Sequence, residues 1–241
     1  MNMNNSITYR EIVYFVIDEL KEFSDDTTYT PEHIIFLADT MRSRLLYEKY
    51  KDARKGEPAR SNYQTISFNL MQVPALAGTS CYGTFLKTDI KLPTLLNIGI
   101  PHIYSSTSDK AIYYFNNEHF TLIPMERMPY VGNNKWLSNI IYVAKGPDDY
   151  LYLKSSNPQF LYLKNLSIDA IFQNPKDIIE LCNCNCDLLD SYFPIEESLV
   201  HILISNIVAE LSGVKYQPTD KVNNAKNDME NVATTNNKKD E

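Results

Sequence analysis

"TYREIVYFVIDELKEFSDDTTYTPEHIIFLADTMRSRLLYEKY", residues 8–50, decides the fold because two amphipathic runs flank one short polar segment. Thr8 and Glu11 have the spacing of a capping box, in which a hydroxyl and a carboxylate satisfy free backbone N–H groups at a helix start. Apolar residues then recur with the helical period, at Ile12, Val13, Val16, Leu20 and Phe23. This first run therefore predicts one amphipathic helix.

A second helix is expected after the polar segment. Thr30, Pro31 and Glu32 have the order of an N-cap, a first-turn proline and an acid near the positive end of the helix dipole. The apolar positions that follow are Ile34, Leu37, Ala38, Met41, Leu45 and Leu46. Residues 24–29 then form the short connection of a helical hairpin. The alternative, an acidic calcium loop, lacks the glycine and the alternating ligands that such a loop needs.

From Ser61 the apolar period changes from 3.6 to 2. Ile66, Phe68 and Leu70 alternate with polar residues, which is typical of a half-buried strand. Turn residues at 116–117 and 145–148 lie between β-prone runs and predict hairpins, and residues 160–172 predict another strand or two. The stretch from 61 to about 175 is therefore predicted to be an antiparallel β domain, either a barrel or a sandwich.

The helical period returns after Pro194, with an apolar stripe at Leu199, Ile202, Leu203, Ile207, Val208 and Leu211. Gly213 is expected to end this helix, and the helix is expected to pack on the first two because none can bury its stripe alone. Residues 214–241 have almost nothing to bury, so we expect them to be disordered alone and ordered on assembly. The predicted class is α+β: a helical hairpin (1–60), an inserted β domain (61–178), a closing helix (179–213) and a flexible tail (214–241).

Composition and charge limit the function. The 241 residues carry a formal net charge of -7, which argues against a dedicated nucleic-acid-binding protein. The 7 glycines are scattered, so no phosphate-binding loop is visible. No apolar run reaches about 18 residues, and the N-terminus does not have the form of a secretory signal. We therefore expect no membrane partner, and synthesis in the host cytoplasm.

The sharpest chemical motif is "CNCNC", with Cys182, Cys184 and Cys186. In a strand, successive thiols of this set lie about 7 Å apart on one face, too far for one metal ion, and zinc sites favour other spacings. Small thiols in a connecting segment are one interpretation, and a metal or redox role is the alternative. The four histidines are isolated and no nucleophile stands beside a base, so we expect no catalytic residue, no metal and no cofactor.

Two groups of residues are candidates for contact with a partner. The basic group is Arg42, Arg44, Lys49, Lys51, Arg54, Lys55 and Arg60, and the tail anchors are Tyr216, Val222 and Met229. The basic group is either a solvated helix end or a binding site for acidic groups of a neighbour. The 17 tyrosines also favour a protein that uses its surface to bind.

The two ends of the chain resemble a known family. A first helix, "EFSDD", the pattern T-x-E-H and a second helix ending in Y-x-K-Y resemble the N-termini of phage head-to-tail adaptor or ring proteins. The resemblance is greatest to those of crAss-like and related Bacteroides podoviruses. The block "YFPIEESLVHILISNIVAEL", residues 192–211, followed by an Asn- and Asp-rich tail, resembles their closing helix.

The resemblance implies a virion structural protein, a subunit of a homo-oligomeric ring, commonly twelvefold, that docks beneath the portal protein in the neck between capsid and tail. It implies helices around the channel and a β domain that faces other tail or neck ring proteins. DNA passes without specific recognition, and an acidic chain suits this channel because attraction to phosphates slows passage. The family has no catalytic residues to carry over, so no enzyme is implied. Two alternatives stay open: a β-rich module that binds a ligand or glycan, and an enzyme that uses the cysteine cluster.

Overall fold

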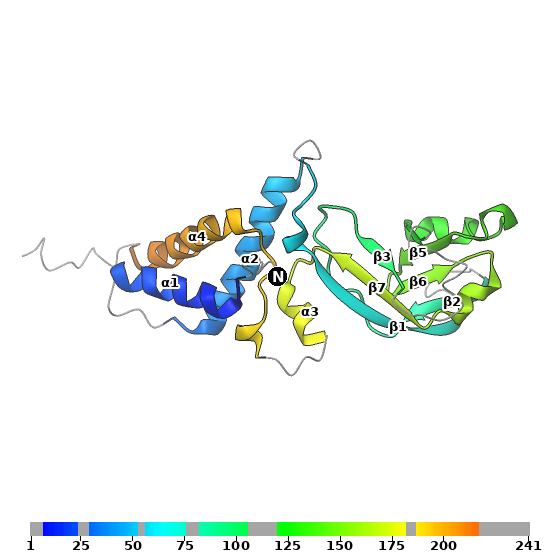
Figure 1. Cartoon of the computed structure of the whole chain (residues 1–241), viewed down its shortest axis with the longest axis horizontal. Helices are drawn as coiled ribbons and strands as arrows, with labels where there is room; N and C mark the ends of the chain where they lie inside the picture. Colours follow the sequence, from blue (N-terminus) through cyan, green and yellow to red (C-terminus); the bar gives the residue numbers. More distant parts are fainter. Residues whose placement is uncertain are drawn as a thin grey trace, which may run out of the picture.

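The computed structural model describes residues 7–23, 29–52, 56–75, 82–105, 120–181 and 187–216. The described chain is elongated, with helices at one end and a twisted sheet at the other (Figure 1). The helical end combines the two ends of the sequence, and the sheet comes from its middle. The predicted α+β class with a β insertion between helices is confirmed.

The three long helices are α1 (Tyr9–Phe23), α2 (Pro31–Tyr50) and α4 (Glu197–Tyr216). The Thr8 N–H donates to Oε2 of Glu11 at 2.8 Å, and the Glu11 N–H donates to Oγ1 of Thr8 at 3.3 Å. Oγ1 of Thr30 accepts from the His33 N–H at 3.4 Å. Both predicted helix starts are therefore confirmed.

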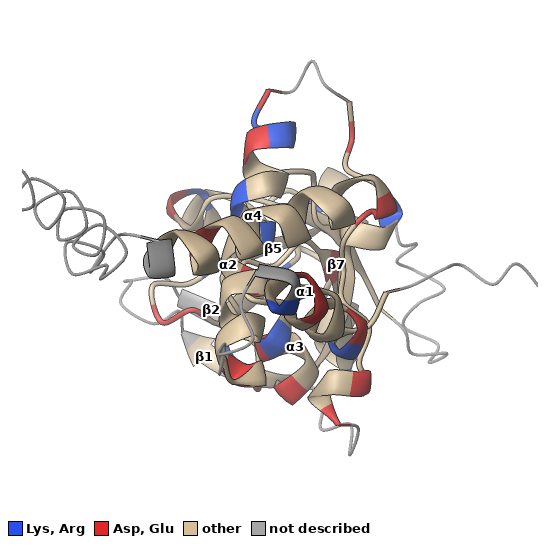
Figure 2. Cartoon of the chain, turned by 90° about the vertical axis from the view of Figure 1, so that its left-hand side faces the viewer, with Lys and Arg blue, Asp and Glu red and all other residues tan. Residues whose placement is uncertain are grey.

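The three helices pack on one another around one apolar core, and Figure 2 views this end of the molecule. Its most deeply buried side chains include Val16, Ile34, Leu46, Leu203 and Ile207. The prediction that the closing helix packs on the hairpin is confirmed. The prediction that Gly213 ends this helix is wrong, because α4 continues to Tyr216 and the φ of Gly213 is not left-handed.

The buried face of α2 differs from the predicted stripe. Leu37, Met41 and Leu45 are only partly buried, whereas the polar side chains of Asp39 and Arg42 are buried. The reason is that the second half of α2 packs against the connections into the sheet as well as against the other helices. A single apolar stripe therefore does not describe the inward face of this helix.

The described residues form a sheet of seven strands in the order β3-β7-β1-β2-β6-β5-β4. Their bounds are β1 (Gln64–Ala75), β2 (Tyr82–Thr88), β3 (His102–Tyr104), β4 (Phe120–Leu122), β5 (Ile141–Lys145), β6 (Leu151–Lys154) and β7 (Asn165–Ala170). The first half of β1 pairs with β7 and its second half pairs with β2. The two edge strands, β3 and β4, contact each other, so the sheet curls into a nearly closed barrel.

Six pairs of neighbouring strands occur in this sheet, and five are antiparallel as predicted. β4 and β5 are parallel, because the chain between them passes through the 3₁₀ helices η5 (Met125–Tyr130) and η6 (Lys135–Leu137) before it returns. The predicted hairpin at residues 145–148 is confirmed, since it joins β5 to β6. The turn predicted at residues 116–117 lies outside the described residues.

Short helices occur where the sequence predicts strand or connection. Residues 160–172 contain β7 as predicted, but the preceding segment forms the 3₁₀ helix η7 (Pro158–Tyr162). Asn157 explains this difference, because its Oδ1 accepts from the Gln159 N–H at 3.0 Å and caps a helical turn. The others are η2 (Arg60–Asn62), α3 (Pro175–Leu181) and η8 (Leu188–Asp190).

The helical and sheet cores meet without a sharp border. Ile98 and Ile171, from the β region, pack in the helical core, whereas Ile178 of α3 packs in the sheet core. Ile66 and Phe68 are buried in the sheet core as their alternation predicts. The division of the chain at residues 61, 178 and 213 stays a proposal.

Candidate assembly surfaces

Arg42 fixes the sheet to the helical end. Its side chain has 0% exposed surface, Nη1 donates to the carbonyl of Phe172 at 3.0 Å, and Nη2 donates to the carbonyl of Asn62 at 3.0 Å. Its Nε donates to the carbonyl of Pro194. Asn62 and Phe172 flank the β insertion, so one guanidinium holds both of its connections. Burial lowers the pKa of Arg42 to about 10, which leaves the group charged at neutral pH.

Asn62 and Glu196 extend this junction to the start of α4. The Glu196 N–H donates to Oδ1 of Asn62 at 2.9 Å. The Tyr50 hydroxyl donates to Oε2 of Glu196 at 2.8 Å, and Lys49 forms an ion pair with the same carboxylate. The end of α2 and the beginning of α4 are therefore held together, so the outer faces of the helices are fixed relative to one another.

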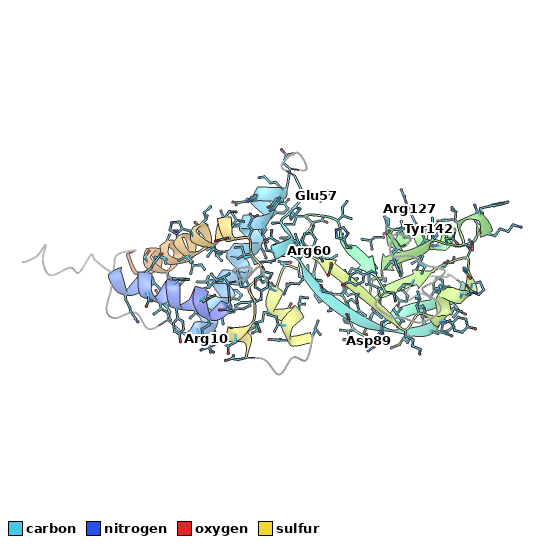
Figure 3. The ribbon with its side chains drawn as sticks, in the orientation of Figure 1. Arg10, Glu57, Arg60, Asp89, Arg127 and Tyr142 are labelled. Atoms are coloured by element: carbon cyan, nitrogen blue, oxygen red, sulfur yellow. The ribbon has the colours of Figure 1, made fainter. Side chains whose placement is uncertain are left out.

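The structure separates the predicted basic residues into different environments. Arg42 is buried in the single chain, where it belongs to the junction described above, and its predicted contact with a partner stays a prediction. Lys49 is paired with Glu196 and belongs to the junction. Arg60 pairs with Asp169 near the base of the sheet, where Figure 3 labels it.

Two basic side chains of this group stay on the outer surface of α2 and its end. Arg44 is exposed and pairs with Glu48 on the same helix at 3.0 Å. Lys51 is exposed just beyond the helix. Arg54, Lys55, Val222 and Met229 lie outside the described residues, as does the side chain of Tyr216. Contact of these residues with a partner stays a prediction.

The outer face of α1 carries two exposed aromatic side chains. Tyr14 is 55% exposed and Phe15 is 53% exposed, although Val13 and Val16 beside them are buried. We call Tyr14 and Phe15 the α1 ridge. Because the buried face of α1 is turned toward α2 and α4, the ridge points away from the helical core.

A groove runs between the outer faces of α2 and α4. Its volume is about 380 Å³, and it is lined by Met41, Arg44, Leu45, Glu48, Asn206, Ala209 and Glu210. We call it the α2–α4 groove. α1 packs on both helices and contributes no residue to the groove, so the α1 ridge and the α2–α4 groove are two separate surfaces of the helical end.

A third surface lies at the end of the sheet that is farthest from the helices. The aromatic side chains Tyr130, Trp136 and Tyr162 are 84%, 84% and 72% exposed. They come from η5, η6 and η7, which Figure 1 places at the far end of the molecule. Leu137 is 43% exposed on the same segment as Trp136. We call Tyr130, Trp136 and Leu137, which the consecutive helices η5 and η6 carry, the distal patch.

Sequence reasoning missed the members of the α1 ridge and the distal patch. The abundance of tyrosine indicated binding surfaces but not their positions. A signal for the ridge was present, because Tyr14 and Phe15 fall beside the apolar stripe of α1 and not on it. The distal patch has no periodic signal, since 3₁₀ segments of three to six residues are too short to show one.

The described residues contain no group of three or more His, Cys, Asp or Glu side chains placed to hold a metal ion. The three clustered cysteines lie outside the described residues. No helix in the described part of the chain has the length and apolar character needed to cross a membrane.

The chain matches known proteins over nearly its whole length. Residues 11–229 match the family described as phage tail ring protein 2. The chain is 45% identical over 229 residues to a protein named "Ring protein 2" of Bacteroides phage crAss001, an alignment that covers 92% of this chain and 98% of that relative. The resemblance seen at the two ends of the sequence therefore extends over nearly all of it. The chain belongs to the phage tail ring protein 2 family.

Proposed function

We propose that this protein is a structural subunit of a closed homo-oligomeric ring, twelvefold, in the neck of a phage virion. The ring docks beneath the portal protein, with its helical ends toward the DNA channel and its sheets toward other tail proteins. DNA passes through without specific recognition, and the protein is not an enzyme. Membership of the ring protein family supports the structural role.

The observation that carries the ring proposal is that the α1 ridge and the α2–α4 groove are two different surfaces of one helical end. Contact between two different surfaces of identical chains leaves one of each surface free, so further chains add head to tail until the rotation closes a ring. The ridge offers Tyr14 and Phe15 as protruding side chains. The groove offers apolar positions between two helices, including Ala209, and it is bordered by polar and charged side chains such as Glu48 and Asn206.

The charge of the protein supports passage of DNA through the ring. The formal net charge is -7, and a channel made from acidic subunits gives DNA phosphates no strong attachment. Figure 2 shows acidic and basic residues interspersed along the described ribbon of the helical end. Such a surface suits a conduit better than a nucleic-acid binding site.

Cryo-electron microscopy of purified particles tests the proposed position and stoichiometry. We expect a twelvefold ring of this fold directly beneath the portal, with helices nearest the axis. Absence of the fold from the neck contradicts the proposed function. A closed ring with another number of subunits contradicts only the twelvefold assignment.

Mixing two variants tests the ridge-to-groove contact. Phe15→Glu places a charge on the ridge, and Ala209→Arg fills the groove. At concentrations where the wild type forms rings, each variant should stay monomeric, and their mixture should stop at dimers, because only one ridge and one groove are intact in each pair. Light scattering after size exclusion measures this.

The control for the groove variant is His201→Arg, an exposed change on α4 outside the groove. This variant should assemble like the wild type. Rings formed by Phe15→Glu or by Ala209→Arg alone contradict the proposed contact.

A further inference from the structure

We propose that the distal patch is the docking surface for an acidic, partly apolar protein segment of a neighbouring virion component. The inference rests on the proposed function, which places the sheet toward other tail proteins. To that function it adds the surface that contacts the neighbouring component and the chemical character of the contacted segment.

The exposure of the distal patch is unusual for aromatic side chains. Tyr130 and Trp136 are each 84% exposed, more than any other large hydrophobic side chain described in this protein. Tryptophan and tyrosine are enriched among the residues that dominate binding energy in protein interfaces, since they bury much apolar area at a small entropic cost. The exposed side chains of the patch contribute little to the packing of the chain itself.

The segments that carry the patch are held in place by the sheet. The Ser156 hydroxyl donates to the carbonyl of Asn134 at 3.0 Å, and the Ser155 hydroxyl donates to the carbonyl of Ile140 at 2.9 Å. Oδ1 of Asn134 caps η6 by accepting from the Trp136 N–H at 3.0 Å. The segment with Trp136 is thereby fixed beside the end of β6. A supported aromatic side chain loses little freedom on binding, which favours affinity.

The η5 helix is anchored by a buried side chain. Met128 has 0% exposed surface and packs in a small core with Phe85 and Tyr152. Lys154 donates to the Met128 carbonyl at 3.5 Å. Tyr130, two residues after Met128, is therefore presented from a segment that is fixed to the sheet. The patch combines exposed side chains with a backbone that does not need to reorganise.

The charges beside the patch select the partner. Arg127 and Lys135 lie in the two helices that carry Tyr130 and Trp136, and Glu126 is the one acid within those helices. Figure 3 labels Arg127 on the outer side of the sheet, near Tyr142. No acidic partner of Arg127 occurs among the described residues. This local excess of positive charge, on a protein of net charge -7, favours an acidic segment.

Lys135 adds to the same effect. Its Nζ lies 5.8 Å from the centroid of the Trp136 ring, so the charge sits over the aromatic surface that the partner covers. A carboxylate of the partner can then approach Lys135 while an apolar group covers Trp136. This arrangement favours a segment that carries both acidic and apolar side chains.

Photocrosslinking in assembled particles tests the inference. A photoreactive benzoylphenylalanine replaces Trp136 in the phage, and in a control it replaces Ile100, which is 74% exposed outside the patch. We expect a crosslink from position 136, but not from position 100, to a segment of another virion protein with net negative charge. Mass spectrometry of the crosslinked peptide identifies that segment.

A charge variant tests the electrostatic part. Arg127→Glu combined with Lys135→Glu should lower the yield of this crosslink about tenfold, the ratio expected if the lost attraction is worth about 1.4 kcal/mol. Lys91→Glu reverses the charge of an exposed lysine outside the patch and should leave the yield unchanged. Circular dichroism and the thermal midpoint confirm that each variant is folded.

The outcomes separate the inference from the proposed function. If rings are present at the neck, a crosslink from position 136 to DNA, to a basic protein segment or to a glycan overturns the inference alone. The absence of any crosslink from that position does the same. An unchanged crosslink yield in the folded double variant also overturns it. Particles that lack the ring contradict the proposed function instead.

Discussion

The hydroxyl of Tyr9 donates a hydrogen bond to Oδ1 of Asp39 at 3.0 Å, and both side chains are buried between α1 and α2. Burial raises the pKa of Asp39 to about 6, although Arg42 on the next turn of the helix opposes the shift. The folded protein therefore holds a proton at Asp39 in a pH range where the unfolded chain has lost it.

The pH dependence of stability should reveal this carboxyl. Because the pKa is higher in the folded state, the contribution of Asp39 to stability is greatest below about pH 4 and is lost as the pH rises to about 6. The loss is up to about 3 kcal/mol. Asp39→Asn removes this titration and can still accept from Tyr9. Urea unfolding of the wild type and of Asp39→Asn between pH 4 and 7 measures the pH dependence. A difference in the free energy of unfolding that stays constant over this range contradicts the prediction.

Replacing Arg42 should affect stability far more than replacing Arg44. Arg42→Met leaves three buried carbonyls without their donor, and we expect a loss of about 3–5 kcal/mol in the free energy of unfolding. Arg44→Met breaks only an exposed pair with Glu48 and should cost less than about 1 kcal/mol. Urea unfolding compares the two, and similar losses contradict the assigned role of Arg42.

Gly213→Ala should stabilise the protein. The new Cβ meets nothing within 4 Å, and Gly213 lies within the helix without a left-handed φ. Alanine favours a helix over glycine by up to about 1 kcal/mol. The thermal midpoint should therefore rise, and Ala209→Gly on the same helix should lower it. A fall in the midpoint for Gly213→Ala indicates that the glycine ends the helix in solution.

Replacing Cys182, Cys184 and Cys186 together by serine should leave folding and ring assembly near normal. Their spacing fits no common zinc site, and disulfides between them are not expected if the chain is made in a reducing cytoplasm, as the sequence predicts. Elemental analysis of the wild type and the thermal midpoint of the variant check this. Stoichiometric zinc in the wild type, together with unfolding of the variant, contradicts it.

The helices could be predicted from the sequence because their signals are local. The cap at Thr8 and the stripe from Ile12 depend on residues within four positions of one another. The structure reproduces the cap and the stripe as far as Leu20, and the side chain of Phe23 lies outside the described residues. Arg42 could not be separated from Arg44 by charge alone. Arg42 lies four residues from Ala38 and from Leu46, and this spacing did indicate the buried face. Its hydrogen-bond acceptors are distant in the sequence, however, and the carbonyl of Phe172 is 130 positions away.

The assembly surfaces were harder to predict because exposure depends on tertiary packing. Trp136 and Met128 are both large apolar residues in 3₁₀ segments, yet one is exposed and the other is buried. Whether such a side chain is exposed or buried depends on which side of its segment packs against the sheet. In the same way, the parallel pairing of β4 with β5 follows from the path of the chain between them and not from the composition of either strand.

The insertion of the sheet between α2 and α4 sets the order of folding during synthesis. α2 ends at Tyr50 and α4 begins at Glu197, so ribosomes working at about 5–20 residues per second need roughly 7–30 seconds to pass from one to the other. During that interval the apolar faces of α1 and α2 lack the helix that covers them. The sheet is complete before α4 emerges, and the helical end closes last. A nascent chain stalled before Glu197 is therefore expected to bind chaperones through its first two helices.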